Sequence, residues 1–321
     1  MGHLWVQGIF IAVLLSGECH ASSEGSWCYI DEACGPTTWE SLGHCDGDRQ
    51  SPIDIISSKA ISNSTLGPVT LSKSYEDPKK LLEMKNTGKT VDVELGEGLF
   101  LSGPGLPGAY MAKSFHFHWG DGVSKPGSEH YIDGRQYSME LHIVHTRNNM
   151  SVSDALDDPQ GIAVLGFFVQ GSETAKGKTA KAWESLSKNL QDVKEKGEDK
   201  NLHSTVSLQD LLGPTNLGRY FRYSGSLTTP GCDEVVIWTV FADPILVPSK
   251  VVAFFPFSLR STDSSEGPHL KNNFRPLQKI SDRKVETSAF LTHRSAASRA
   301  SQPVAFILLF LCISAFGFFP V

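Results

Sequence analysis

The sequence of 321 residues has no surplus of basic residues, no internal repeat and no long linker. Lys and Arg number 29 against 35 Asp and Glu, which gives a formal net charge of −6. A nucleic-acid partner would require a basic surface, so this balance argues against binding of DNA or RNA. The 29 glycines and 17 prolines are too few for a collagen or a low-complexity chain. A hydrophobic content of 40% is typical of a globular protein.

Two apolar segments lie at the ends of the chain. Residues 4–15 (LWVQGIFIAVLL) are too short to span a bilayer and lead into small and polar residues. This pattern predicts a secretory signal peptide over residues 1–21. Residues 304–321 form the second apolar segment, which reaches the last residue with no Lys or Arg after it.

Small residues and a polar spacer precede the C-terminal apolar segment. This order is typical of a GPI-anchor signal, here over residues 286–321, with attachment at Ser288 or Ser295. A tail-anchored single span is the alternative. We therefore expect residues 22–285 to form one domain on the extracellular face of the plasma membrane, which the protein would reach by the secretory pathway.

Cysteine is scarce, and no close Cys-x-x-Cys pair indicates a structural zinc site. Outside the two end segments the cysteines are Cys28, Cys34, Cys45 and Cys232. An even number in a secreted chain indicates two disulfides, and three pairings are open. Sequons at Asn63 and Asn149 predict N-glycosylation in the same compartment.

Between the ends, short stretches rich in Val, Ile and Phe recur between turn signals, which predicts a mainly β domain with a few short helices. The expected strands include residues 90–95, 114–119, 137–145, 162–169 and 234–241. Helical patterns cover residues 179–190 and 207–212, and the charged run at 192–200 is expected to be a solvated loop.

The segment FHFHW at 115–119 is the most informative. Side chains two apart share one face of a strand, so His116 and His118 point one way and the aromatic rings point the other. The next strand contains MELHIVH at 139–145, and an antiparallel return would bring His142 beside the pair. Alone, an H-x-H pair is weak, because hydrogen-bonded surface histidines produce it too. A cupin site begins in the same way, but the first glutamate after the pair, Glu129, is too far along the chain for that motif.

Three neutral imidazoles on one side would make a zinc site with an open fourth position, which is the catalytic rather than the structural arrangement. Ligation by nitrogen alone favours ionisation of a bound water near neutral pH. Glu140 shares a strand face with His142 and can accept a hydrogen bond from the other nitrogen of that ring. His145 points away, so we expect it to be hydrogen-bonded in the core.

Several motifs in a fixed order make the chain resemble the α-class carbonic anhydrases, from about residue 27 to about residue 285. They are DRQSPIDI at 48–55, FHFHWG at 115–120, GSEH at 127–130, MELHIVH at 139–145, SLTTP at 226–230 and NFRPLQ at 273–278. The resemblance implies a single domain around a large, mostly antiparallel twisted sheet, with zinc at the bottom of a conical cavity. The cysteines and the tail resemble the GPI-anchored extracellular branch, which implies the pairs Cys28–Cys34 and Cys45–Cys232.

The resemblance also implies roles for individual residues. The zinc ligands would be His116, His118 and His142, with Glu140 orienting the last of them. Thr228 would accept a hydrogen bond from zinc-bound hydroxide and donate its own proton to Glu129. Substrate would lie beside Thr229 and an apolar wall of Val144, Val164, Leu227, Val236 and Trp238.

The implied activity is the reversible hydration of carbon dioxide to bicarbonate and a proton (EC 4.2.1.1), with zinc-bound hydroxide as nucleophile; carbonic anhydrase is itself the standard example of zinc lowering the pKa of its water to about 7. A catalytically silent binding module of the same fold is the alternative. Silent relatives lose a zinc ligand, and this chain keeps all three. The expected ligands are carbon dioxide, bicarbonate and water, a protein partner such as a bicarbonate transporter stays open, and we expect a monomer.

Two positions depart from the family pattern. Lys89 stands where the most active members have a histidine that carries protons. A lysine near its usual pKa of about 10.4 exchanges protons poorly at neutral pH, so we expect imidazole buffer to raise turnover. Ser114 stands where many members have a glutamine that bonds the first ligand. Because serine is shorter, we expect a water to bridge it to that ring and zinc to be held slightly less well.

Overall fold

The computed structural model describes residues 27–291. The expected signal peptide, the candidate anchor position Ser295 and the hydrophobic tail lie outside these residues. Within residues 27–291, no helix has the length and apolar character needed to cross a bilayer.

The elements of the described chain are mostly short. The strands are β1 (Asp54–Ile55), β2 (Ile61–Asn63), β3 (Thr70–Leu71), β4 (Leu81–Asn86), β5 (Val91–Leu95), β6 (Phe100–Ser102), β7 (Tyr110–Trp119), β8 (Tyr131–Ile132), β9 (Met139–Arg147), β10 (Ile162–Ser172), β11 (Asp199–Asn201), β12 (Tyr220–Gly225), β13 (Val236–Pro248) and β14 (Glu286–Ser288). The α-helices are α1 (Val152–Leu156), α2 (Lys178–Lys188), α3 (Leu208–Leu212) and α4 (Ser249–Ser258). The 3₁₀ turns are η1 (Pro36–Leu42), η2 (Ser57–Lys59), η3 (Lys73–Glu76), η4 (Pro78–Lys80) and η5 (Asn189–Asp192).

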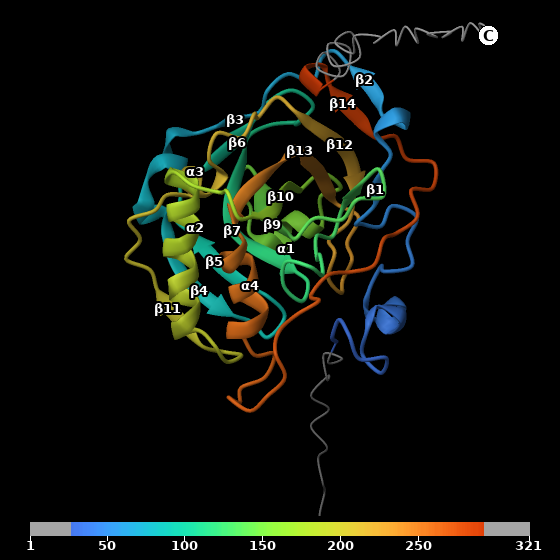
Figure 1. The fold of residues 1–321 in the computed structure, drawn as a ribbon. Coiled ribbons are helices and arrows are strands. Elements are labelled where there is room, and N and C mark those ends of the chain that lie inside the picture. The colour runs from blue at the N-terminus through green and yellow to red at the C-terminus, as the bar shows by residue number, and fades with distance from the viewer. Residues whose placement is uncertain (1–26, 292–321) are drawn as a thin grey trace, which may run out of the picture.

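A twisted sheet of 12 strands runs through the molecule (Figure 1). Its main order is β11-β4-β5-β7-β9-β10-β13-β12-β14-β2, and β6 joins β3 to β7. The β5–β7, β7–β9, β9–β10 and β12–β13 pairs are antiparallel, whereas β10 and β13 are parallel. The predicted mainly β domain with a large, mostly antiparallel sheet is therefore confirmed.

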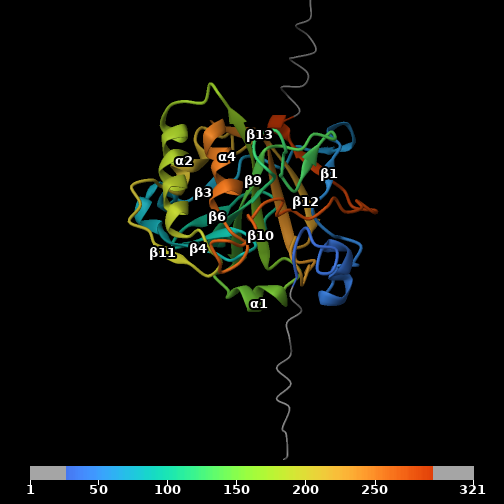
Figure 2. The same cartoon turned by 60° about the horizontal axis from the view of Figure 1, so that its bottom comes forward.

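The alternation along β7 decides which face of the sheet is filled by helices. Phe117 packs on Trp183 of α2 and Phe255 of α4, with ring centroids 5.6 and 5.2 Å apart. Trp119 packs on the same Phe255 ring at 5.3 Å. Both helices lie together on this face (Figures 1 and 2). The side chains between these aromatic residues, His116 and His118, therefore point to the opposite face.

The expected helices are present as α2, continued by η5, and as α3. Ser207 caps α3: its hydroxyl accepts the Asp210 N–H, and the Asp210 carboxylate accepts the Ser207 N–H. The charged run at 192–200 is not all loop, because residues 199–201 form β11 and pair with β4 at the sheet edge.

The sheet also continues past residue 285. Strand β14 pairs with β12 and with β2. Ser288 is fully buried there, and its hydroxyl donates to the carbonyl of Gly218. Residues 286–288, which the sequence assigned to the C-terminal signal, are therefore part of the sheet.

Candidate active site

Three histidines from two neighbouring strands converge on the open face of the sheet. His116 and His118 lie on β7, and His142 of β9 stands directly opposite His116 in the antiparallel register. The ring centroids lie between 4.6 and 5.3 Å apart. One nitrogen of each ring lies within 4.8 Å of the other two. The predicted antiparallel return therefore brings the three rings together.

The outward nitrogens of two rings are held by acceptors. His118 Nδ1 donates to the Asn273 carbonyl at 2.8 Å, and His142 Nε2 donates to Glu140 Oε1 at 2.7 Å. This fixes the tautomers, so that His118 Nε2 and His142 Nδ1 present lone pairs to the centre. His118 Nε2 is buried and makes no hydrogen bond in the described part of the chain, with Glu129 Oε2 3.3 Å away. An orphaned nitrogen inside a ring of imidazoles fits a metal ligand.

The protein keeps two of these imidazoles neutral. Burial, with a further contribution from His142, lowers the pKa of His116 to about 3. The same causes hold the pKa of His118 well below its usual value. Burial alone would raise the pKa of Glu140, but its two histidine neighbours, His130 and His142, hold it well below the usual range. Neutral imidazoles backed by an ionised acceptor are what zinc requires.

His116 is backed in a way that sequence reasoning missed. Ser114 Oγ donates to Asp92 Oδ1 at 3.0 Å, and the same oxygen lies 3.9 Å from His116 Nδ1. Ser114 therefore bonds Asp92 of β5, and the carboxylate is the group that faces the ring. Burial raises the pKa of Asp92 to about 6, with Ser114 opposing the shift. The alternation of VDVEL at 91–95 was the available signal, since it puts Asp92 on the polar side of its strand.

Thr228 and Glu129 meet beside the histidines, as the resemblance implied. Glu129 Oε1 accepts the Arg275 backbone N–H at 2.8 Å. Burial raises the pKa of Glu129 to about 7, and His142, the Arg275 N–H and the Thr228 side chain oppose the shift. Glu129 is wholly buried, so it is not the solvated loop acid that its sequence position alone would suggest.

A cavity of about 320 Å³ opens over the histidines. One wall is apolar and is formed by Val144, Val164, Leu227 and Trp238, next to Thr228 and Thr229. Val236 is buried in the same apolar cluster but does not line the cavity. The polar side includes Thr87, Lys89, Thr90 and Asp92. Trp27 and Tyr29 complete the lining, and no sequence pattern pointed to either.

Lys89 lies at the cavity with its ammonium over an aromatic ring. Its Nζ is 4.9 Å from the centroid of Trp27. Burial, and after it the charge of Lys196, lower the pKa of Lys89. The pKa of this lysine therefore lies below the usual value that was assumed from the sequence.

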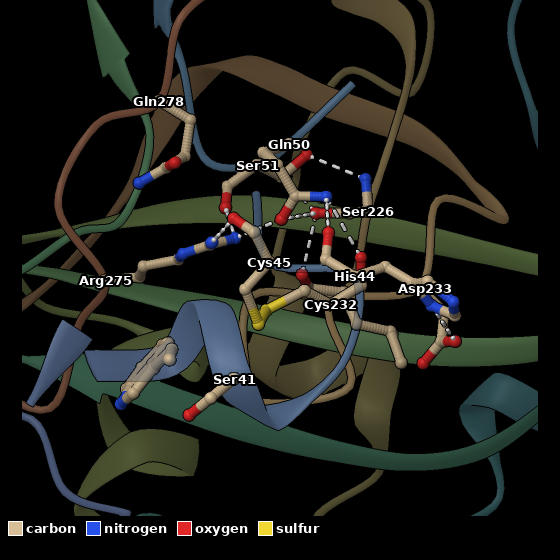
Figure 3. Close-up of a disulfide and its surroundings, with 12 residues drawn as sticks. Ser41, His44, Cys45, Gln50, Ser51, Ser226, Cys232, Asp233, Arg275 and Gln278 are labelled. Carbon is tan, nitrogen blue, oxygen red and sulfur yellow. Dashed lines mark hydrogen bonds and ion pairs between the residues drawn. A yellow bond between two sulfur atoms is a disulfide. The ribbon is translucent and has the colours of Figure 1, made fainter. Parts of the chain in front are cut away.

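Two disulfides secure the N-terminal region, in the pairing that the resemblance implied. Cys28 pairs with Cys34, and Cys45 pairs with Cys232. Cys232 follows Thr228 by four residues, so the second disulfide ties the loop with Thr228 to the chain after η1 (Figure 3). Arg275 lies nearby and donates to the carbonyls of Cys45 and Ser51.

The fold and this site define a class, the carbonic anhydrases. A family model described as eukaryotic-type carbonic anhydrase matches residues 34–289, so the chain belongs to this family. It is 39% identical over 306 residues to carbonic anhydrase 4 of Rattus norvegicus, covering 89% of this chain and 91% of the relative. It is 37% identical over 272 residues to carbonic anhydrase 4 of Oryctolagus cuniculus, with 83% and 85% covered. It is 33% identical over 307 residues to carbonic anhydrase 15 of Mus musculus, with 92% and 93% covered. The resemblance in the motifs is confirmed, and the protein is a carbonic anhydrase by family.

Proposed function

We propose that this protein is a GPI-anchored, extracellular zinc enzyme that interconverts carbon dioxide and bicarbonate. The observation that carries the proposal is the buried His118 nitrogen, which makes no hydrogen bond and lies in a cluster of three imidazoles beneath an open cavity. Zinc bound by His116, His118 and His142 would supply a Lewis acid that activates water near neutral pH.

The residues around the imidazoles would orient the reactants. The Arg275 N–H holds Glu129 in place. Glu129 would accept a hydrogen bond from the Thr228 hydroxyl, so that the Thr228 oxygen can accept a hydrogen bond from the attacking oxygen. The apolar wall of Val144, Val164 and Trp238 offers no hydrogen bonds, so it suits a small apolar substrate such as carbon dioxide and holds charged bicarbonate poorly. Asp92 would accept the Nδ1 proton of His116, directly or through a water.

Proton release is the step for which this cavity is least equipped. Lys89 stands at the position of the histidine carrier, and its ammonium rests on Trp27. Even with a lowered pKa, an ammonium group is a weaker match to neutral pH than an imidazole near 6.5. We therefore expect imidazole buffer to raise turnover. Equal turnover in dilute and concentrated imidazole would contradict this.

Attachment of the lipid at Ser288 is disfavoured by the fold. Ser288 is buried within β14, so we propose an anchor further along the chain, with Ser295 as the candidate. Release from cells by a phosphatidylinositol-specific phospholipase tests the anchor against a tail-anchored span.

Of the two sequons, Asn149 is exposed, and its Oδ1 accepts a hydrogen bond from Lys113, whereas Asn63 donates its Nδ2 to Glu286. We propose glycosylation at both, with fuller occupancy at Asn149, because a glycan on Asn63 would replace one Nδ2 hydrogen beside Glu286 and crowd that contact.

Stopped-flow hydration of carbon dioxide by the purified protein, with and without a zinc chelator, tests the activity. We expect hydration that the chelator abolishes and zinc restores. His142→Asn should abolish both hydration and zinc content, whereas His145→Asn, a change three residues along the same strand, should abolish neither. A protein that holds one zinc and hydrates no carbon dioxide would instead be the catalytically silent binding module.

A further inference from the structure

The carboxylate of Glu140 is shared between two histidines. Its Oε1 lies 2.7 Å from His142 Nε2 and 2.7 Å from His130 Nδ1. Its Oε2 accepts the backbone N–H of His130 at 2.8 Å. His130 thus donates a hydrogen bond to each oxygen of Glu140, once from its ring and once from its backbone. The side chains of His130, Glu140 and His142 are all buried.

The hydrogen bonds continue from His130 to the loop on the other side of the site. His130 Nε2 lies 2.6 Å from the Tyr223 hydroxyl, which lies 2.8 Å from Ser51 Oγ. Ser51 and Ser226 then bond each other twice: the Ser51 N–H donates to Ser226 Oγ at 2.9 Å, and the Ser226 N–H donates to Ser51 Oγ at 3.1 Å. Figure 3 shows this pair of serines next to the Cys45–Cys232 disulfide. Ser226 stands two residues before Thr228.

Only one assignment of protons lets every group bond in this chain while both imidazoles stay neutral. A carboxylate can only accept, so His130 carries its proton on Nδ1 and its Nε2 must accept. The Tyr223 hydroxyl therefore donates to His130, and its oxygen accepts from Ser51. Ser51 Oγ in turn accepts from the Ser226 backbone. Because all these groups are buried, each lost partner would leave an unpaired polar atom in the interior.

Two glycines leave room for this chain of bonds. A Cβ at Gly225 would lie 2.3 Å from Ser51 Oγ and 2.7 Å from the Tyr223 ring. A Cβ at Gly166, which stands opposite His142 in the sheet, would lie 3.1 Å from Glu140 Oε1. A side chain at either glycine would therefore crowd an oxygen that takes part in these hydrogen bonds.

We propose that Tyr223 and His130 are positioning residues of the metal centre, which hold Glu140 on His142 and join that ligand to the loop that carries Thr228. The proposal rests on the proposed function in one respect, namely that the three histidines bind zinc. Tyr223 does not line the cavity, so its hydroxyl would act on the site through its hydrogen bonds to His130 and Ser51.

The test is the rate at which the zinc-loaded protein loses metal to excess chelator, followed with a zinc-sensitive dye. Tyr223→Phe removes one hydroxyl and keeps the ring, which is parallel to Trp238 at 6.4 Å. We expect zinc loss to be about 3- to 10-fold faster, less than the about 10- to 100-fold typical of losing a group that bonds a ligand directly. The matched control is Tyr220→Phe, on the same strand, which loses a bond to the Gly67 carbonyl and should release zinc at the native rate.

A double-mutant cycle separates positioning from general destabilisation. In a Glu140→Gln background, Tyr223→Phe should accelerate zinc loss by less than about twofold, because the link through which it acts is already changed. Should Tyr223→Phe fail to fold, Ser51→Ala, which removes the preceding donor, takes its place with a smaller expected effect. Equal zinc loss in the two tyrosine variants, or full additivity with Glu140→Gln, would overturn this inference alone. A native protein that holds no zinc would overturn the proposed function and this inference with it.

Discussion

His145 gives a quantitative prediction about stability in acid. It lies on β9, three residues after the candidate ligand His142, and its side chain is wholly buried. Its Nδ1 donates to the carbonyls of Ile143 and Ala163 at 2.9 and 3.2 Å, and its Nε2 accepts from the Tyr75 hydroxyl at 2.6 Å. Every polar atom of the neutral ring is satisfied, as the sequence predicted for a core histidine.

The pKa of this ring sets the size and direction of the effect. Burial lowers the pKa of His145 from 6.5 to about 4. In the unfolded chain the ring takes up a proton as the pH falls through about 6.5, whereas in the folded protein it stays neutral down to about 4, so stability is lost on acidification. From pH 7.5 to pH 5 the loss from this group alone is about 2 kcal/mol, and about 3 kcal/mol once both forms are protonated.

The measurement is urea unfolding of the metal-free protein at pH 7.5 and pH 5, compared with His145→Asn. The asparagine can still donate one hydrogen bond but has no proton to gain, so the variant should be less stable at pH 7.5. It should then lose about 2 kcal/mol less than the native protein between the two pH values. His203→Asn is the control, because that imidazole is exposed before and after unfolding. Equal losses in the native protein and in His145→Asn would refute the reasoning, since the ring would then be no harder to protonate in the core than in water.

The remaining predictions concern the site. Replacing Cys45 and Cys232 by serine opens a link across 187 residues and should cost about 4–5 kcal/mol in urea unfolding; a cost below about 1 kcal/mol would mean that other contacts hold the loop. Gly166→Ala places a methyl group against Glu140 and should speed zinc loss to a chelator; an unchanged rate would show that the carboxylate can shift without consequence. Lys89→His should raise turnover in buffers that carry protons poorly and reduce the benefit of added imidazole; if imidazole helps both forms equally, Lys89 is not what limits proton release.

The fold and the cluster of three histidines could be predicted from local pattern. In FHFHW the period of two separates the imidazoles from the aromatic rings, and the rings do pack on α2 and α4. Glu140 and His142 share a strand face for the same reason. The strand at the sheet edge could not be predicted in this way. β11 lies within a charged run, and it pairs with β4, a segment more than a hundred residues away in the sequence.

The residues that surround the ligands could not be predicted in the same way. Asp92 was missed because its relation to His116 arises from the pairing of β5 with β7. Trp27 reaches the cavity from the N-terminal segment, where no periodic pattern marks it. The shift in the Lys89 pKa comes from burial and from Lys196, and neither can be seen around position 89 in the sequence.

The sequence by itself determined the excess of acidic residues that argues against nucleic-acid binding, the apolar ends, the alternating strands and the three histidines, because each of these is a property of neighbouring residues. The tertiary structure alone decided which nitrogens of His118 and His142 face the centre of the cluster, since that depends on the acceptors Asn273 and Glu140. It also decided that Glu129 is buried beside Thr228 and that Tyr223 is linked to His142. Hydrogen bonds of about 3 Å join residues brought together only by folding, and no local pattern encodes them.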